Sequence, residues 1–363
     1  MILCVIFVWC AMLAVSSISA QAQAAQADCE PLYKTFLDNR KGPDLDKYKT
    51  ALMAGNNYLT KCGGLDEEIK TYVTKQIPKI SETVRTTELV NRFNAAVPTK
   101  NWDEAFSSGK ELIASNHSAS LDVMIVLASI GYTNAMADPP IDKFNSDSLV
   151  YAKTVIQKLN EGATSESFGS YQFAYKTKIC PDGKPNTMSW MNYFIGRITY
   201  LRLNQKKEAV PYLYAAHKSG CELKNDSEIY RLIGAWYVDD AIKLNTARAA
   251  KIKAAGDQET EETKADEALL NGYLDRGIDA YARAYSSANS TNSQAYKDAL
   301  HKRLEGLFDS RHDGNHDGID KFVAGVMNNP FPDPTTPVKP VVDPPPPTAQ
   351  TMPASAVTIP KKP

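Results

Sequence analysis

Apolar residues recur at the spacing of an α-helix along almost the whole chain after Asp28. The alternation typical of a β-strand is confined to Tyr171, Phe173 and Tyr175, in a long connection that ends at the turn PDGKPN. The pattern therefore predicts an all-α protein. The predicted helices are Pro31–Asn39, Leu45–Thr60, Glu67–Ile80, Thr83–Val97, Trp102–Ser115, Leu121–Met136, Asp147–Leu159, Trp190–Leu203, Lys206–Ser219, Ser227–Leu244, Asp266–Ser287, Ser293–Arg311 and Gly318–Met327.

Three of these helices contain an Ile-Gly pair within the apolar stripe: Ile130-Gly131, Ile195-Gly196 and Ile233-Gly234. A glycine inside a helix costs about 1 kcal/mol relative to alanine. Its recurrence in one local setting predicts positions where a neighbouring helix comes too close for a side chain. This interpretation favours a stacked array of antiparallel helical hairpins.

The glycines belong to a pattern that resembles the tetratricopeptide repeat. The segment Tyr230-x2-Ile233-Gly234-x2-Tyr237 matches the first-helix signature of that family, and the segments around Gly131 and Gly196 match it in part. The second-helix signature, small-x3-large-x2-small, recurs at Ala209/Leu213/Ala216 and Gly277/Tyr281/Ala284, with weaker copies at Ala152/Ile156/Leu159 and Ala105/Gly109/Leu112. The resemblance covers roughly residues 83–290.

The spacing between the two signatures departs from that of the family, which places the first-helix glycine about 12 positions before the second-helix alanine. Ala209 follows Gly196 by 13 positions, whereas Gly277 follows Gly234 by 43. The chain is therefore similar to a divergent array with insertions. One insertion is the charged stretch around residues 249–268, which is interpreted as a solvated helix extension or a mobile loop. An irregular all-α protein is the alternative fold.

The resemblance implies a function for the chain. Tetratricopeptide-like arrays curve into a concave surface, and families with this scaffold bind peptides or serve as assembly platforms. The chain also resembles uncharacterised exported bacterial proteins of this type. It is therefore expected to be a non-catalytic protein-binding or scaffold module of the bacterial cell envelope, with a protein or peptide partner.

The two ends of the chain differ from its middle in composition. Residues 1–20 are almost purely apolar and are followed by small residues with Ala-x-Ala sites, which predicts a signal peptide over residues 1–27 and an exported, periplasmic or secreted protein. No Lys or Arg precedes the apolar run, so an uncleaved anchor remains an alternative. Residues 330–363 hold 12 of the 21 prolines and predict a disordered, partly polyproline-II tail. Between them, residues 28–82 are expected to form an N-terminal helical hairpin region and residues 83–329 the tetratricopeptide-like domain.

Four cysteines remain once the signal segment is removed: Cys29, Cys62, Cys180 and Cys221. An even number in an exported chain predicts two disulfides. Cys29 lies just before the first predicted helix and Cys62 just after the second, so an antiparallel hairpin brings them to the same end. This leaves Cys180 to pair with Cys221. A zinc site is the competing interpretation, but no Cys-x-x-Cys motif or histidine at ligand spacing supports it.

Charge and motifs add little further chemistry. The net charge of −1 gives no reason to propose nucleic acid or an anionic membrane as a partner, and no segment after the signal is long enough for a membrane span. Motifs of serine hydrolases, zinc proteases and nucleotide-binding loops are absent from the sequence, so no cofactor is expected and a non-enzyme is favoured. Carboxylate pairs of the glycosidase type need no local motif, which leaves a periplasmic enzyme or a glycan- or peptide-binding protein using residues 168–214 as the alternative.

One loop resembles a calcium site in part. Asp313, Asn315, Asp317 and Gly318 fit positions 1, 3, 5 and 6 of an EF-hand loop, but position 12 is Ala324 in place of the bidentate glutamate. The alternative is that Asp317 caps the following helix.

Aromatic residues give the candidate binding site. The connection Ser167–Met188 is longer than a plain helix connection and is expected to be held by Cys180. We expect Tyr171, Phe173 and Tyr175 to border a ligand or partner surface, with Trp190 and Tyr193 behind them. The alternative is that these rings fill the core.

Overall fold

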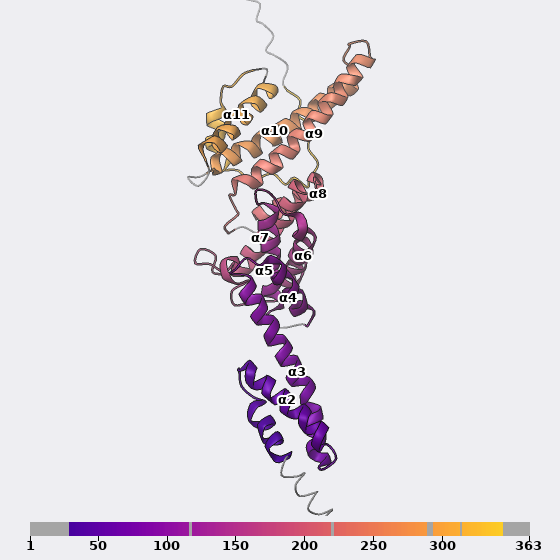
Figure 1. Cartoon of the computed structure of the whole chain (residues 1–363). Helices are drawn as coiled ribbons and strands as arrows, with labels where there is room; N and C mark the ends of the chain where they lie inside the picture. Colours follow the sequence, from indigo (N-terminus) through magenta and orange to yellow (C-terminus); the bar gives the residue numbers. More distant parts are fainter. Residues whose placement is uncertain (1–28, 116–117, 219–220, 289–292, 313, 344–363) are drawn as a thin grey trace, which may run out of the picture. The chain divides into compact units, whose positions relative to one another are not determined.

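The computed structural model describes residues 29–115, 118–218, 221–288, 293–312 and 314–343 (Figure 1). Over these ranges the chain is all-α, as predicted, and contains no β-strand. The described residues fall into two compact units. The N-terminal unit comprises the chain up to Asn134 together with Gln157–Ala174, and the C-terminal unit comprises Ala135–Ile156 together with the chain from Tyr175 onward.

The N-terminal unit begins with a helix over residues 29–39. The helices that follow are α2 (Leu45–Cys62), α3 (Glu67–Ala96), α4 (Trp102–Ala114) and α5 (Ser120–Ala135), which ends one residue beyond the unit boundary. Asp44 and Asp66 begin α2 and α3, because each carboxylate accepts backbone N–H bonds from the first turn. Phe36, Tyr58 and Val73 form the core of this first bundle.

Helix α3 differs from the prediction. The sequence pattern divides this region into Glu67–Ile80 and Thr83–Val97, but the structure has one continuous helix of 30 residues with Pro78 inside it. Buried residues recur along its whole length, from Val73 to Phe93. The helix packs against α2 in its first part and against α4 in its last part, and this continuous burial outweighs the weak helix propensity around Ser81.

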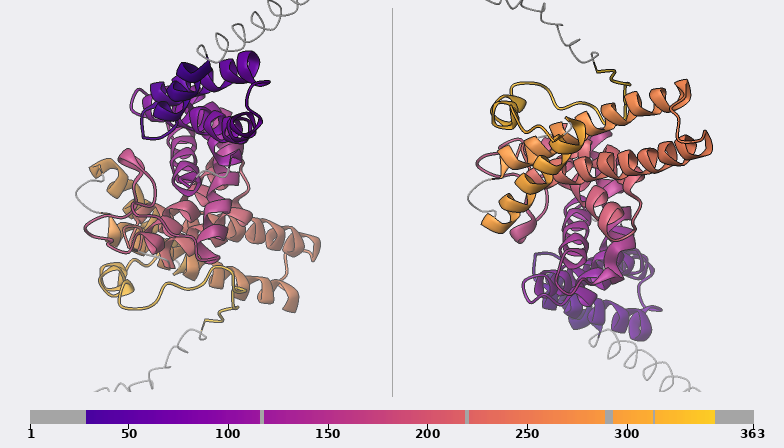
Figure 2. Two further views of the ribbon diagram at one scale, coloured as in Figure 1. Left: turned by 90° about the horizontal axis from the view of Figure 1, so that it is seen from below. Right: turned by 90° about the horizontal axis from the view of Figure 1, so that it is seen from above.

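The C-terminal unit contains a short 3₁₀ turn and seven α-helices among its described residues. These elements are η1 (Asp142–Phe144), α6 (Asn145–Asn160, most of which belongs to this unit), α7 (Gly183–Leu201), α8 (Lys206–Lys218), α9 (Ser227–Ala254), α10 (Glu261–Ser287), α11 (Gln294–Arg311) and α12 (Ile319–Val326). Helices α7 and α8 pair as one hairpin and α9 and α10 as another, while α11 and α12 pack against α10. Figure 2 shows these hairpins from two further directions.

Both hairpins are closed by the same contact, which confirms the interpretation of two of the glycines. A Cβ atom added to Gly196 would lie 2.7 Å from Leu213 of α8, and one added to Gly234 would lie 2.9 Å from Tyr281 of α10. Each glycine therefore lets the large residue of the facing helix approach the backbone. These large residues are the ones that the second-helix signature identifies.

A second contact is common to both hairpins and lies seven positions before the glycine of the first helix. Ser189 of α7 donates a 2.5 Å hydrogen bond to the carbonyl oxygen of Ala216, and Ser227 of α9 donates a 2.6 Å bond to that of Ala284. Each serine precedes its helix glycine by seven positions, and each alanine follows the facing large residue by three. The two hairpins therefore share one packing register.

The hairpins differ in length. Leu213 follows Gly196 by 17 positions, whereas Tyr281 follows Gly234 by 47. The 30 extra residues lengthen α9 and α10 by about 15 residues each, which is about 22 Å of helix. They form the paired arm that projects in Figures 1 and 2. The charged stretch around residues 249–268 is thus mainly a helix extension, with a turn at residues 255–260.

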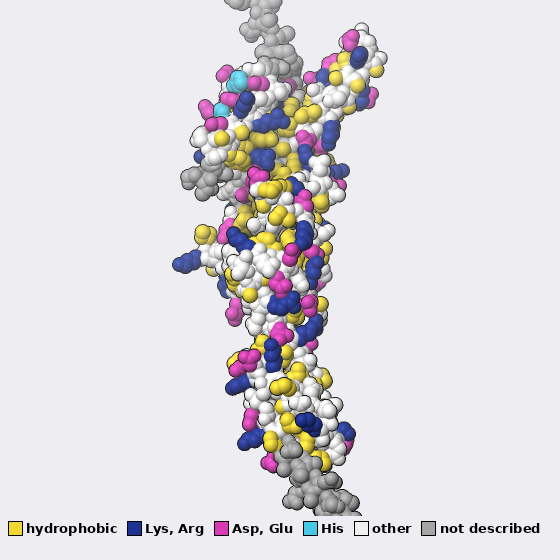
Figure 3. Space-filling view, in the orientation of Figure 1, with side chains coloured by type: hydrophobic (Ala, Val, Ile, Leu, Met, Phe, Trp, Pro, Cys, Tyr) yellow, Lys and Arg dark blue, Asp and Glu magenta, His cyan; other side chains and the backbone are white. Residues whose placement is uncertain are grey.

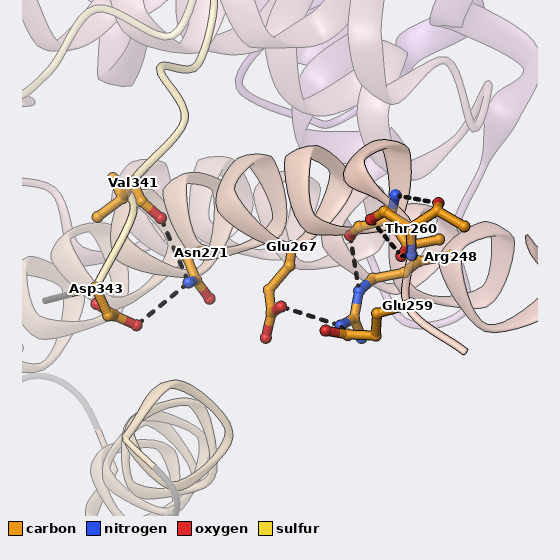
Figure 4. A network of polar contacts seen from close by, with 8 residues as sticks. Arg248, Glu259, Thr260, Glu267, Asn271, Val341 and Asp343 are labelled. Atoms are coloured by element: carbon orange, nitrogen blue, oxygen red, sulfur yellow. Dashed lines mark hydrogen bonds and ion pairs between the residues drawn. The ribbon is translucent and has the colours of Figure 1, made fainter. Parts of the chain in front are cut away.

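Ion pairs stabilise this arm. Arg248 of α9 contacts Glu259 and Glu267, and its Nε donates to the carbonyl oxygen of Thr263 at 3.1 Å (Figure 4). Lys251 pairs with Asp266 at 2.7 Å. Helix α9 therefore continues to Ala254 in place of the predicted Leu244, because cross-helix charge pairs replace the apolar stripe that the prediction relied on.

Candidate peptide-binding surface

Residues 330–343, here called the C-terminal segment, run along the C-terminal unit without forming a helix. Phe331 is 7% exposed. Its ring centroid lies 5.0 Å from that of Tyr230, 5.6 Å from that of His217 and 6.0 Å from that of Tyr214. These side chains, with Arg283, form what we call the Phe331 pocket, on helices α8, α9 and α10.

Arg283 forms the charged wall of the pocket. Its guanidinium carbon lies 5.3 Å from the Phe331 ring centroid, a cation–π geometry. Its Nη1 donates to the carbonyl oxygen of Asn329 at 3.0 Å, and its Nε donates to Asp279 at 2.7 Å. Burial raises the pKa of Asp279, while the bonds from Arg283 act in the opposite direction. One buried ion pair thus holds the backbone of the segment next to its aromatic residue.

His217 completes the pocket. Its Nδ1 is bonded to the carbonyl oxygen of Lys224, and the Tyr230 hydroxyl donates to the same oxygen at 3.1 Å. Burial lowers the pKa of His217, which favours the neutral ring beside Phe331. Burial also raises the pKa of Tyr230 to about 12. His217 and Tyr230 therefore present neutral rings to Phe331 at neutral pH, beside the charged guanidinium of Arg283.

The second half of the segment lies along α10. The backbone N–H of Val341 donates to the carbonyl oxygen of Ala268 at 2.7 Å, and Asn271 reaches the carbonyl of Val341 and the carboxylate of Asp343 (Figure 4). A Cβ atom on Gly272 would lie 2.2 Å from the carbonyl oxygen of Lys339, so only glycine admits the segment at this position.

The end of the segment is held by charge. Arg311 of α11 donates to both carboxylate oxygens of Asp343 at 2.8 Å and to Asp275 at 2.7 Å. The structure therefore differs from the prediction of disorder from Pro330 onward, because Phe331, Val341 and Asp343 find partners in the helices. Residues 344–363 lie outside the described residues.

The predicted aromatic site is divided by the structure. Tyr171 and Phe173 belong to the N-terminal unit, where the strand-like alternation of the sequence corresponds to the 3₁₀ turn η2 (Tyr171–Phe173). Tyr171 is 43% exposed and donates a 3.0 Å hydrogen bond to the Asn94 side chain. Phe173 is half-buried. Because Tyr171 is exposed, it remains available to a partner, and its role in partner binding stays a prediction.

Tyr175, Trp190 and Tyr193 belong to the C-terminal unit. Tyr175 is 8% exposed and its ring contacts those of Trp190 and Phe194, at centroid distances of 5.8 and 6.4 Å. Tyr193 is buried as well. Trp190 is half-buried, and its indole N–H donates to Glu222 at 2.8 Å. For Tyr175 and Tyr193 the alternative interpretation holds, because their rings are part of the core and border no open surface.

Both predicted disulfides are present. Cys29 and Cys62 are joined across the first hairpin with a Cα–Cα distance of 5.9 Å, and Cys180 and Cys221 are joined with a distance of 6.0 Å. Two disulfides fit a protein of an oxidising compartment, as expected for an exported chain. The predicted signal peptide, residues 1–27, lies outside the described residues. No helix within the described ranges combines the length and apolarity that a membrane span requires.

The partial calcium loop takes a different arrangement. Asp313 lies outside the described residues, and the Asn315 side chain accepts a 2.7 Å bond from the backbone N–H of Asp317. Helix α12 begins at Gly318, whose φ of 97° places it in the left-handed region. The predicted cap by Asp317 is wrong, since no side chain caps this helix. Across the residues that the structure describes, no cluster of three metal-ligating side chains occurs.

A groove lies beside the C-terminal segment. It is bounded by α10, α11, α12 and the segment itself, and its volume is about 650 Å³. Figure 3 shows hydrophobic and basic side chains next to one another over α10. Asp275 and Asp279 also line the groove, but each is already bonded to an arginine, Arg311 or Arg283.

A comparison of the chain with known protein families, with curated proteins and with solved structures finds no match. The surface is therefore interpreted from its own geometry.

Sequence reasoning missed the Phe331 pocket, although one signal was available. Phe331 is flanked by Pro330 and Pro332 in the stretch NNPFPDP. Prolines lack an N–H group and lose little conformational freedom when they bind, so a proline-flanked aromatic is a low-cost docking element. The proline content of this stretch predicts a disordered, partly polyproline-II tail and gives no sign of the docking.

Proposed function

We propose that this chain is a non-catalytic protein-binding module of the bacterial cell envelope, built on a tetratricopeptide-like array, that binds an extended peptide on the face of α8, α9 and α10. The observation that carries the proposal is Phe331 in its pocket. A surface that holds an extended, proline-rich stretch of its own chain has the contacts needed to hold a similar stretch of a partner.

The shared packing of the two hairpins supports the repeat part of the proposal. Gly196 against Leu213 and Gly234 against Tyr281 pair the glycine of a first helix with the large residue of a second helix. This is the pairing that the tetratricopeptide resemblance implies. Stacked hairpins of this kind leave extended faces on which peptides lie.

The partner chemistry follows from the pocket. An aromatic side chain would enter between Tyr214, His217 and Tyr230, and backbone carbonyls before it would accept bonds from Arg283. The partner would therefore present an aromatic residue in an extended stretch, with proline beside it. The C-terminal segment occupies this position within the same chain, so a partner competes with a ligand of high effective concentration, on the order of millimolar.

The proposal is tested with a fluorescently labelled peptide of residues 328–343 added to the full-length protein. The Phe331→Ala variant should bind the peptide, because its own segment no longer fills the pocket. The wild-type protein should bind it at least about tenfold more weakly, since its own segment competes. Val342→Ala is the matched control, because Val342 is 82% exposed in the same segment, and it should behave as wild type. Failure of the Phe331→Ala variant to bind the peptide would contradict the proposal.

A further inference from the structure

The groove between α10, α11, α12 and the C-terminal segment has an apolar and a cationic part. Phe308 of α11 and Phe322 of α12 form its apolar wall, with ring centroids 5.9 Å apart. Phe308 is buried, whereas Phe322 is 38% exposed. Arg276 of α10 lines the same groove.

Arg276 differs from the arginines around it. Arg283 is bonded to Asp279, and Arg311 is bonded to Asp275 and Asp343. For Arg276 no hydrogen bond or ion pair occurs with any residue that the structure describes, and its Nη1 is buried without a partner. Arg276 and Arg311 both line the groove, and of these two only Arg276 has no carboxylate among the described residues bonded to it, so it is the arginine that is left to bind an anionic ligand.

The charge of the groove selects the kind of acceptor. Asp275, Asp279 and Asp317 line it as well, and they repel any anion, a phosphate dianion about twice as strongly as a singly charged group. A carboxylate carries a single charge and matches the two-pronged geometry of a guanidinium. The aromatic wall beside Arg276 fits an apolar side chain.

These features occur together at the carboxyl end of a polypeptide. A C-terminal residue carries its carboxylate and its side chain on one Cα atom, so the carboxylate lies on Arg276 when the side chain lies on Phe322. Asp317 lines the same groove and can accept a hydrogen bond from a backbone N–H group of such a peptide. A fatty acid would leave Asp317 and Lys339 against its chain, which is unfavourable.

We propose that this groove binds the C-terminal carboxylate of a partner peptide whose last side chain is apolar, with Arg276 as the carboxylate ligand. The site is separate from the Phe331 pocket, and a peptide can bind there while Phe331 stays in its pocket. Val341 and Lys339 of the C-terminal segment form one of its walls, so it is complete while the segment is bound.

The test uses two labelled pentapeptides of the sequence Gly-Ser-Gly-Ser-Phe, one with a free carboxylate and one with an amidated end. Binding to the full-length protein is measured by fluorescence polarisation. The free acid should bind at least about tenfold more tightly than the amide, as expected for a charge-assisted bond. Equal binding of the two, or binding of neither, would overturn the proposal.

Variants separate the two parts of the site. Arg276→Gln should weaken the acid about tenfold and leave the amide unchanged, which abolishes the discrimination. Phe322→Ala should weaken both peptides by the same factor, because it removes the apolar contact alone. Arg303→Gln is the matched control, since Arg303 is an exposed arginine of α11 outside the groove. Arg276→Gln with unchanged discrimination would refute the assignment, provided that its thermal unfolding curve matches wild type.

Discussion

The hairpins α7/α8 and α9/α10 are built alike near their glycines and differ beyond them. Each has a glycine facing a large side chain and a serine bonded to a carbonyl of the facing helix. Only α9/α10 carries the arm, and only its second helix lies under the latter half of the C-terminal segment, from Lys339 to Asp343. The comparison indicates that a few matching contacts are enough to define the hairpin. The additional residues of α9 and α10 provide a surface on which the segment docks.

The largest effect is expected at the docked segment, whose first half contacts α8, α9 and α10 and whose latter half lies along α10. Phe331→Ala removes a buried aromatic side chain and should reduce the free energy of docking by about 3 kcal/mol. Amide hydrogen exchange should then increase in residues 330–343 and in the facing turns of α8 and α10, with α7 unchanged. Increased exchange in α7 of the same size would break the distinction between the hairpins.

The next effect concerns the shared glycine contact. Gly196→Ala and Gly234→Ala should each destabilise the protein by about 1–3 kcal/mol, because the added Cβ meets Leu213 or Tyr281. Gly196→Ala should cost more, since a backbone nitrogen lies 3.1 Å from the new atom and the backbone yields less than a ring. The measurement is the free energy of unfolding in urea.

The control for this pair is Gly306→Ala in α11. Gly306 has no atom within 4 Å of an added Cβ, so alanine should stabilise the helix by about 0.5–1 kcal/mol. If Gly196→Ala, Gly234→Ala and Gly306→Ala all stabilise the protein, helix propensity determines the effect at Gly196 and Gly234, and the close approach of the facing helix does not.

The serine contacts should give a smaller difference. Ser189→Ala and Ser227→Ala each leave a buried carbonyl without its donor, at a cost of about 1–2 kcal/mol. Ser227→Ala should cost more, because Ser227 also bonds the Tyr296 hydroxyl at 3.1 Å. Chemical denaturation of both variants measures the difference, and an equal or smaller cost for Ser227→Ala would contradict the contribution of the Tyr296 contact.

The smallest effect is a pH dependence confined to the Phe331 pocket. The folded-state pKa of His217 is lowered by burial, with contributions from Arg283, Lys224 and Lys218. The undocked state binds the proton more readily, so docking is fully stable above the ordinary pKa of 6.5 and weakens as the pH falls below it. Proteolysis of the segment as a function of pH should show this loss. His217→Phe should remove the dependence and His301→Gln should retain it.

Helical periodicity predicted most of the fold. The ends of α4, α5 and α8 lie within about two residues of the predicted ones, a normal tolerance for helix ends. Helix α7 begins at Gly183, seven residues before the predicted Trp190, because Asn186, Thr187 and Ser189 are buried polar residues bonded to backbone carbonyls. A periodicity of apolar residues does not detect such a turn.

The binding surface was less accessible to sequence reasoning. Tyr171, Tyr175 and Trp190 form one aromatic cluster in the sequence, but burial depends on the helices that cover each ring, and Tyr175 and Tyr171 have different neighbours. Phe331 required knowledge of Tyr230, about a hundred positions earlier, and Arg276 required knowledge of which aspartates are already paired. Such long-range pairing leaves no local pattern.

The most direct test of the central claim is photo-crosslinking of a peptide of residues 328–343 that carries benzoylphenylalanine at position 331. The peptide is added to the full-length Phe331→Ala variant, and the crosslinked residues are identified by mass spectrometry. The account predicts crosslinks to Tyr214, His217 and Tyr230, with competition by the unmodified peptide. Crosslinks that fall elsewhere, or that persist in the presence of the competitor, would contradict it.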